Sequence, residues 1–208
     1  MYDLPQYKES DPEVINQFIA ANPFAFLTGC DENNHPVMTQ VPVFLEAENG
    51  RQFLRGHIMK NTDHHKAFLH NPNVLVVFTG PHCYISGTWY SDPHTASTWN
   101  YISVHVSGHI KFLDQEGLIE ILRKTTLHFE GYNKESTTIF DNLTKEYTGK
   151  LMPAIAGFEI EVSSIENVFK LSQNRDEKSH ENIKVKLREQ GGDAGLIAEE
   201  MEKRGISQ

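Results

Sequence analysis

The sequence has few cysteines and no long apolar run. Its 208 residues include only Cys30 and Cys83, and no stretch approaches the roughly 20 apolar residues that a membrane-spanning helix needs. The first residues have neither a basic region nor an apolar core, so we expect no signal peptide. Without secretion, two reduced thiols are favoured over a disulfide. These absences predict a cytoplasmic protein that does not enter a membrane.

Positive charge is also scarce. The chain has 19 Lys and Arg against 28 Asp and Glu, which gives a net charge of -9. A protein that binds DNA normally has a positively charged surface, because neutralising the DNA phosphates supplies most of the binding affinity. DNA is therefore a candidate partner that the net charge does not support.

Several catalytic signatures are missing. The sequence has no glycine-rich dinucleotide fingerprint, no phosphate-binding P-loop, no Gly-x-Ser-x-Gly elbow and no His-Glu-x-x-His motif. Eleven histidines invite a zinc or iron site, but His64 and His65 are neighbours that point apart on a helix, and no cysteine or carboxylate stands at ligand spacing. We expect no metal site, and the catalytic residues of any enzyme activity stay unknown.

Strand patterns dominate the first half of the chain. Short hairpin-like connections and period-two alternation favour a mainly β protein with helical additions, of the α+β class, built on an antiparallel barrel. Ser10 is expected to cap the first helix, Pro42 to mark an edge or bulge, and Gly80-Pro81 to turn the chain. We predict strands at 24–29, 36–46, 52–58, 74–78, 82–86, 99–113 and 155–162, and helices at 62–70, 117–130, 139–148, 176–189 and 194–204.

One domain is expected to contain all of these elements. The predicted divisions of residues 1–208 are an N-terminal helix within 1–22, barrel strands within 23–113 and 155–163, a helical insertion at 114–150 and C-terminal helices at 176–208.

Basic side chains gather where a strand leads into a helix. Arg55, His57, Lys60 and Lys66 supply hydrogen-bond donors, and the helix N-terminus adds backbone N–H groups. This composition suits a phosphate monoester, but it equally describes a solvated basic face.

Aromatic and small polar residues alternate in a second region. Tyr84–Tyr90 and Thr98–Tyr101 combine large rings with Ser, Thr and Asn, so that a flat heteroaromatic ring could stack there. An aromatic core or a dimer interface would have the same composition.

A third polar region precedes the C-terminal helices at Phe169–Arg175. Lys170 and Arg175 could reach an anion, and Gln173 could form hydrogen bonds with the amide-like edge of a ligand. Asn174 is expected to cap the next helix. A helix cap with surface charge explains the same residues.

Five blocks in order resemble one known family. Leu54–His57, Gly80–Ser86 with Trp89-Tyr90, Thr98–Tyr101, Gly157–Glu161 and Phe169–Arg175 are similar to the PaiB-type FMN-binding negative transcriptional regulators. The resemblance implies a split β-barrel of the pyridoxamine-phosphate-oxidase type, a homodimer with FMN at its interface, and a role as transcriptional regulator. The cofactor-binding residues that it implies are Arg55, Gly56, His57, Lys60, Asn61, Thr98, Trp99, Asn100, Tyr101, Lys170, Ser172, Gln173, Asn174 and Arg175.

One departure touches the expected phosphate region. The family usually carries Asn-Pro followed by an aromatic residue where this chain has Asn61-Thr62-Asp63-His64. Two alternatives stay open. The first is a flavin-dependent oxidoreductase or flavin reductase that acts on a small molecule, since the flavin brings its own redox chemistry. The second is a haem-binding split barrel with His57, His105 or His109 as ligand.

Overall fold

The computed structural model describes residues 1–92 and 94–206, so Pro93, expected in a loop, lies outside the described residues. β-branched and aromatic residues form most of the strands, as their preference for a pleated, half-buried surface predicts. The strands are β1 (Phe24–Cys30), β2 (Pro36–Glu48), β3 (Arg51–Met59), β4 (Asn73–Ile85), β5 (Thr98–Phe112) and β6 (Ile155–Lys170).

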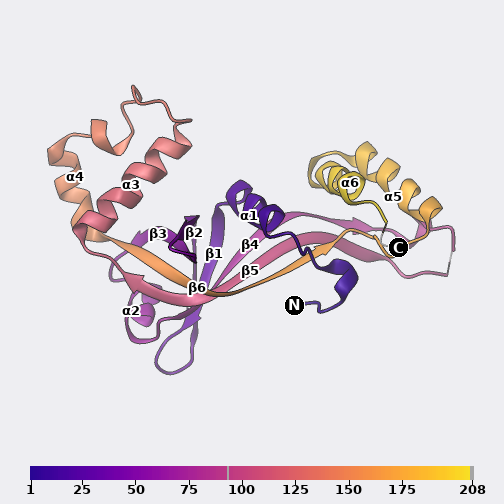
Figure 1. Cartoon of the computed structure of the whole chain (residues 1–208), viewed down its shortest axis with the longest axis horizontal. Coiled ribbons are helices and arrows are strands. Elements are labelled where there is room, and N and C mark those ends of the chain that lie inside the picture. The colour runs from indigo at the N-terminus through magenta and orange to yellow at the C-terminus, as the bar shows by residue number, and fades with distance from the viewer. Residues whose placement is uncertain (93, 207–208) are drawn as a thin grey trace. The chain divides into compact units, whose positions relative to one another are not determined.

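The strands form a closed barrel in the order β1-β2-β3-β6-β5-β4 (Figure 1). β1 with β2, β2 with β3, β3 with β6 and β1 with β4 all pair antiparallel, which confirms the predicted fold class. Pro42 stands where β2 has one paired side, because it pairs with Phe24 of β1 while the register of β2 with β3 starts only at Val43. This edge-like position agrees with the expectation for Pro42, since its missing N–H costs no ladder bond to β3.

Two predicted strand ends are wrong. β4 continues through Gly80-Pro81, where a turn was expected, and β6 extends to Lys170 rather than ending at residue 162. The pairing of β1 with β4 covers only Val74–Val77, so Pro81 lies beyond that ladder. Gly80 is needed for space rather than for a turn, because a Cβ there would lie 2.6 Å from the ring of Phe18.

Side-chain caps start most of the α-helices. Thr62 caps α2 through the backbone N–H of His65, as predicted. The caps expected at Ser10 and Asn174 are wrong: Asp11 accepts from the N–H of Glu13, and Asp176 accepts from that of Ser179, because a carboxylate directly before the first turn reaches these donors. The helices are α1 (Pro12–Ala21), α2 (Asp63–His70), α3 (Gln115–Phe129), α4 (Lys145–Leu151), α5 (Glu177–Gln190) and α6 (Gly192–Arg204), and the 3-10 turns are η1 (Pro5–Tyr7), η2 (Gly87–Trp89), η3 (Phe140–Asn142) and η4 (Met152–Ala154).

The helix predicted at 139–148 is also wrong in extent. The chain instead forms η3, an extended Leu143 and then α4, which starts at a Thr144 cap. A side chain that caps a new helix interrupts the preceding one, since the capping residue itself has extended backbone angles.

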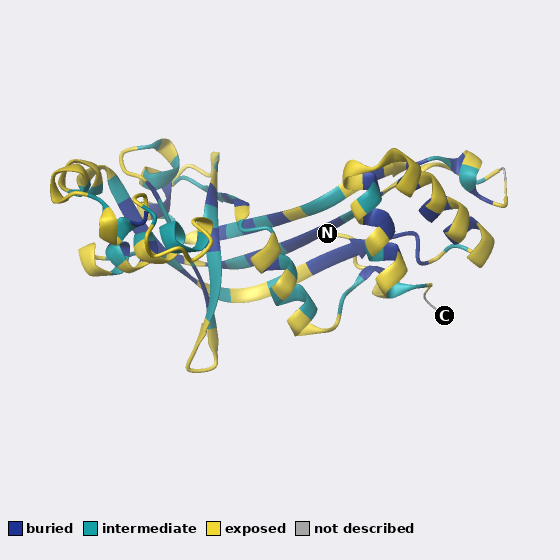
Figure 2. Ribbon diagram, turned by 90° about the horizontal axis from the view of Figure 1, so that it is seen from above, coloured by how far each residue is buried: buried dark blue, intermediate teal, exposed yellow. Residues whose placement is uncertain are grey.

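Contacts group the chain into two compact units. Unit 1 contains Met1–Phe18, Thr79–Val104 and Glu166–Gln208, and unit 2 contains Ile19–Phe78 and His105–Ile165. Each has its own apolar core, and the continuous buried stretches lie along the strands, whereas the helices alternate buried and exposed bands (Figure 2). Fully buried side chains include Leu27, Leu54, Phe158 and Ile160 in unit 2, and Phe169, Leu171, Ile183, Leu187 and Ile197 in unit 1.

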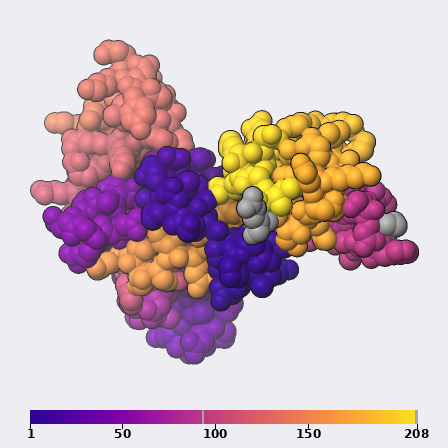
Figure 3. All heavy atoms as spheres, turned by 45° about the vertical axis from the view of Figure 1, so that its right-hand side comes forward, coloured from indigo at the N-terminus to yellow at the C-terminus, as the bar shows by residue number. Residues whose placement is uncertain are grey.

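The N-terminal segment packs against the C-terminal part of unit 1 (Figure 3). Asn167 Oδ1 accepts from the N–H of Glu9 at 2.8 Å, and Gln173 Nε2 donates to the carbonyl of Gln6 at 2.8 Å. Arg204 also pairs with the Glu9 carboxylate. Across the described ranges, no helix is both long and apolar enough to cross a membrane.

Candidate functional site

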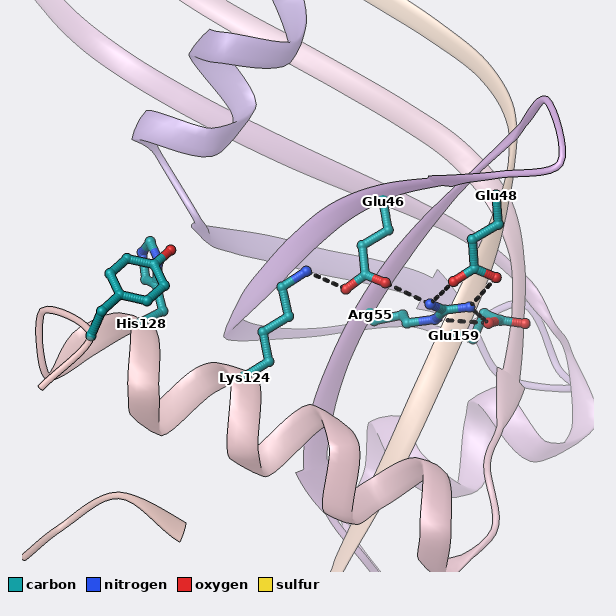
Figure 4. Close-up of polar contacts among 7 residues, drawn as sticks. Glu46, Glu48, Arg55, Lys124, His128 and Glu159 are labelled. Atoms are coloured by element: carbon teal, nitrogen blue, oxygen red, sulfur yellow. Dashed lines mark hydrogen bonds and ion pairs between the residues drawn. The ribbon is translucent and has the colours of Figure 1, made fainter. Parts of the chain in front are cut away.

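In unit 2, Arg55 is already surrounded by carboxylates (Figure 4). Its guanidinium donates to Glu159 Oε2 at 2.6 and 2.9 Å, to Glu46 Oε2 at 2.5 Å, and to both carboxylate oxygens of Glu48. Lys124 of α3 completes this Arg55 cluster by pairing with Glu46. The barrel register creates the arrangement, since Arg55 stands directly opposite Glu159.

The Arg55 cluster holds more negative than positive charge. Three carboxylates face two cations. The hydrogen bond that Arg55 donates to Glu48, followed by those to Glu159 and Glu46, raises the pKa of Arg55 despite partial burial. The same bond from Arg55 lowers the pKa of Glu48. A cavity of about 480 Å³ opens here, with Phe44 and Ile121 on its wall. An added phosphate would meet three carboxylates, so this part of unit 2 disfavours anions.

His57 and Gly56 follow on the same strand. His57 Nδ1 is buried and has no hydrogen-bond partner among the described residues, and burial lowers the pKa of the ring. A neutral imidazole with one unsatisfied nitrogen can bind a ligand group by hydrogen bonding. Gly56 has a packing role instead, because a Cβ there would lie 2.8 Å from both the Phe158 ring and the Pro42 carbonyl oxygen.

Lys60 and Asn61 lie between β3 and α2. The Lys60 side chain is exposed beside a cavity of about 400 Å³, and its N–H donates to the Ala154 carbonyl at 2.8 Å. Asn61 has a φ of +64°, a conformation that Asn tolerates better than most residues, and its N–H donates to His65 Nδ1 at 3.4 Å. Both side chains are open to solvent, but no structural contact assigns them a ligand.

In unit 1, aromatic side chains form an exposed group on β4 and β5. Trp99 is 53% exposed and Tyr84 is 50% exposed, and their ring centroids lie 6.1 Å apart. The centroid of the His82 ring also lies 6.1 Å from that of Trp99. Burial, and then the nearby Tyr2, raise the pKa of Tyr101, which stays a neutral phenol at pH 7. The predicted alternation therefore turns these rings to the outer face of the strands.

The neighbouring polar residues are buried and bonded to one another. Asn100 Oδ1 accepts from Ser172 Oγ at 3.0 Å, and its amide nitrogen contacts the sulfur of Met201 at 3.7 Å. Gln173 accepts from the N–H of Leu171 at 2.7 Å and donates to the carbonyl of Phe169 at 2.6 Å. In this arrangement, Asn100 and Gln173 stabilise the end of β6.

Lys170 and Arg175 differ from Arg55 in lacking a carboxylate. Lys170 Nζ donates to the Trp99 carbonyl at 2.8 Å and to Thr98 Oγ1, and lies 5.9 Å from the Tyr2 ring centroid. The Arg175 guanidinium carbon stacks 4.3 Å from the Tyr90 ring centroid. Within the described ranges, neither cation forms an ion pair. Burial, and then the Arg175 charge, lower the pKa of Lys170.

The structure thus brings part of the expected site together. Thr98, Trp99, Asn100, Lys170 and Ser172 contact one another within unit 1. Asn174 is exposed there and caps no helix. The other candidates, Arg55, Gly56, His57, Lys60 and Asn61, belong to unit 2.

Sequence reasoning missed the partners of the key cations. Glu46 and Glu48 lie two residues apart on β2 and therefore share a face, a signal that the sequence does contain. In the sequence, Glu159 stands out only as part of the block Gly157–Glu161. Nothing in the sequence placed Tyr2 near Lys170, because exposed tyrosines close to a chain terminus are common.

The histidines make local hydrogen bonds. His64 contacts Thr62 and Asp63, each at 3.0 Å, and His109 contacts Ser163 at 3.3 Å. Within residues 1–92 and 94–206, no three His, Cys, Asp or Glu side chains are grouped so that they could hold a metal ion.

Comparison with known proteins shows the family. Residues 1–164 match the model of the family described as "Putative FMN-binding domain". The chain is also 32% identical over 205 residues to protease synthase and sporulation protein PAI 2 of Bacillus subtilis, with 97% of each chain covered.

Two solved structures share the fold. The flavocytochrome Anf3 of Azotobacter vinelandii is 15% identical with a TM-score of 0.60, over 81% of this chain and 72% of that one. An FAD- and haem-binding protein of Mycobacterium smegmatis is 12% identical with a TM-score of 0.54, over 79% and 73%. These identities support the split-barrel fold alone, while the family match and the PAI 2 relative show that the chain belongs to the PaiB-type FMN-binding family.

Proposed function

We propose that this protein is a PaiB-like regulator whose activity depends on bound FMN. The observation that carries the proposal is the exposed aromatic group of Trp99, Tyr84 and His82, which lies within the part of the chain that matches the FMN-binding family. Large exposed rings beside buried polar groups are what a flat aromatic cofactor requires. When bound, FMN supplies redox chemistry that none of the chain's side chains provides.

The residues of each unit fit a flavin by their chemistry. In unit 1, Trp99 offers a stacking surface, and Lys170 holds Thr98 and the backbone of Trp99 in place. In unit 2, the unpaired His57 Nδ1 is suited to accept or donate a hydrogen bond, depending on its tautomer. We assign stacking of the flavin ring to Trp99.

The charge distribution favours indirect regulation. In α5 and α6 most basic side chains pair with acidic ones, as Lys184 and Arg188 both do with Glu202. Paired charges leave little field to attract phosphates, and the net charge is -9. We propose that the protein acts as a homodimer through a partner rather than by gripping operator DNA. Salt-sensitive DNA binding at physiological ionic strength, seen in a gel shift, would contradict this part.

Tryptophan fluorescence can test FMN binding at Trp99, because the chain has only two tryptophans. In Trp89→Phe, the emission of Trp99 should be strongly quenched when FMN is added. In Trp99→Phe, FMN affinity should fall about tenfold, the effect of losing one aromatic stacking contact of about 1.4 kcal/mol.

Trp89→Phe is the matched control, since it removes an indole from the same unit and should keep wild-type affinity. Absorbance spectra after loading and desalting show whether flavin is retained at all. Equal FMN affinity in both variants would reject the proposed site at Trp99. A wild-type protein that cannot be loaded with FMN would reject the proposed cofactor role.

A further inference from the structure

Two positive charges, at the end of β6 and in the turn after it, have no counter-charge among the described residues. Lys170 is 9% exposed, yet its ammonium contacts only neutral oxygens, those of Thr98 and Trp99. A buried charge is normally paired, because removing it from water is costly. An ammonium has three hydrogens, so two acceptors leave one hydrogen unused.

Arg175 adds a second cation close enough to affect the first. Its charge disfavours the protonated form of Lys170, and its own guanidinium lies over the Tyr90 ring at 4.3 Å. Aromatic faces attract cations without carrying a formal charge. Tyr90 and Tyr2 therefore hold the two cations in place and do not neutralise them.

The turn between the cations is strained. Ser172 has a φ of +58°, which is unusual for a residue other than glycine, and it is held there by its hydrogen bond to Asn100. The N–H of Arg175 closes the turn on the Ser172 carbonyl at 3.0 Å. Conformations of this kind persist where the surroundings enforce them and are concentrated at ligand sites.

We propose that Lys170 and Arg175 form a binding site for a phosphate-type oxyanion in unit 1. An anion with two negative charges balances the two cations, takes the unused ammonium hydrogen and offers oxygens to the planar guanidinium. Arg55 of unit 2, one of the basic residues that the sequence suggests for a phosphate, already has carboxylate partners.

The oxyanion has two sources with the same chemistry. One is the phosphate of FMN, in which case the inference rests on the proposed function. The other is the phosphate of a second small molecule. Riboflavin separates them, because it carries the flavin ring without the phosphate.

The experiment compares FMN, riboflavin and inorganic phosphate as ligands of the full chain. The variants are Lys170→Met and Arg175→Gln, and Lys178→Met removes an exposed charge of the same unit as a control. If FMN supplies the anion, both variants should lose at least tenfold in their preference for FMN over riboflavin. If a second ligand supplies it, flavin affinities are unchanged, and phosphate binds the FMN-loaded wild type and the control but not the variants.

The inference is overturned if the preference for FMN over riboflavin and the affinity for phosphate are the same in both variants as in Lys178→Met. Should Lys170→Met fail to fold, Arg175→Gln and the charge-preserving Lys170→Arg decide in the same way. A wild type that binds phosphate through Lys170 but retains no flavin would refute the proposed cofactor and leave the oxyanion site standing.

Discussion

Each unit holds a partly buried cation on a strand, and the two cations have opposite surroundings. In unit 2, Arg55 is 20% exposed and contacts three carboxylates. In unit 1, Lys170 is more buried and contacts none among the described residues. A cation that is already paired serves structure, whereas an unpaired one is free to bind an anion.

The difference arises from cross-strand neighbours. Arg55 faces Glu159 across the β3–β6 ladder, and the acidic residues of β2 approach it from the other side. Lys170 is the last residue of β6, where the chain leaves the ladder, and its neighbours are the hydroxyl of Thr98 and the backbone of Trp99. Local sequence around each cation does not distinguish the two cases.

The largest effect is expected from Arg55→Met. The substitution leaves Glu46, Glu48 and Glu159 close together without their common partner, so the free energy of unfolding should fall by about 3 kcal/mol. Arg55→Lys should lose less, since it keeps the charge but not the planar fork. Urea unfolding measures both, and a loss below about 1 kcal/mol in Arg55→Met would show that the Arg55 cluster is not structural.

A smaller effect is expected at Ser172 of unit 1. Ser172→Ala loses the hydrogen bond to Asn100 and keeps the strained φ, whereas Ser172→Gly loses the bond and relieves the strain. The Gly variant should therefore be more stable than the Ala variant by about 1 kcal/mol. Thermal unfolding compares them, and an Ala variant as stable as the Gly variant would argue against strain in this turn.

Without ligand, Lys170→Met should change the free energy of unfolding little. This is the sharpest contrast with Arg55→Met. Loss of two hydrogen bonds is offset by removal of an unpaired charge, so the net change should stay within about 1 kcal/mol.

The contrast also has a pH dependence with a defined sign. The pKa of Lys170 is lowered in the folded protein, so between that value and 10.5 the unfolded chain binds more protons. Wild-type stability should accordingly rise relative to Lys170→Met as the pH increases through this window. A wild type that instead loses stability relative to the variant would indicate a hidden counter-charge.

The smallest effect concerns the two thiols, one in each unit. Burial, and then Asp193, raise the pKa of Cys83 to about 12, so almost none of it is thiolate at pH 8. Cys30 is only partly buried. Iodoacetamide followed by mass spectrometry should label Cys30 first, and faster labelling of Cys83 in the native protein would contradict its burial.

Much of the fold could be predicted from the sequence. Turn signals, a run of valines and period-two alternation predicted strands that overlap every strand of the barrel, although β4 was predicted as two strands, and Thr62 marked the start of α2. The two errors at strand ends share one cause. Gly80-Pro81 and the end of β6 were misread because local turn and strand preferences yield when neighbouring strands and Phe18 fix the backbone.

By itself, the sequence determined the class of the protein and the residues available for binding: an antiparallel α+β barrel of the PaiB-type family, with an aromatic group and two sets of cations. Only the tertiary structure decided which cations are already neutralised. Electrostatic state depends on distances between residues such as Arg55 and Glu159, 104 positions apart, and those distances are set by strand register.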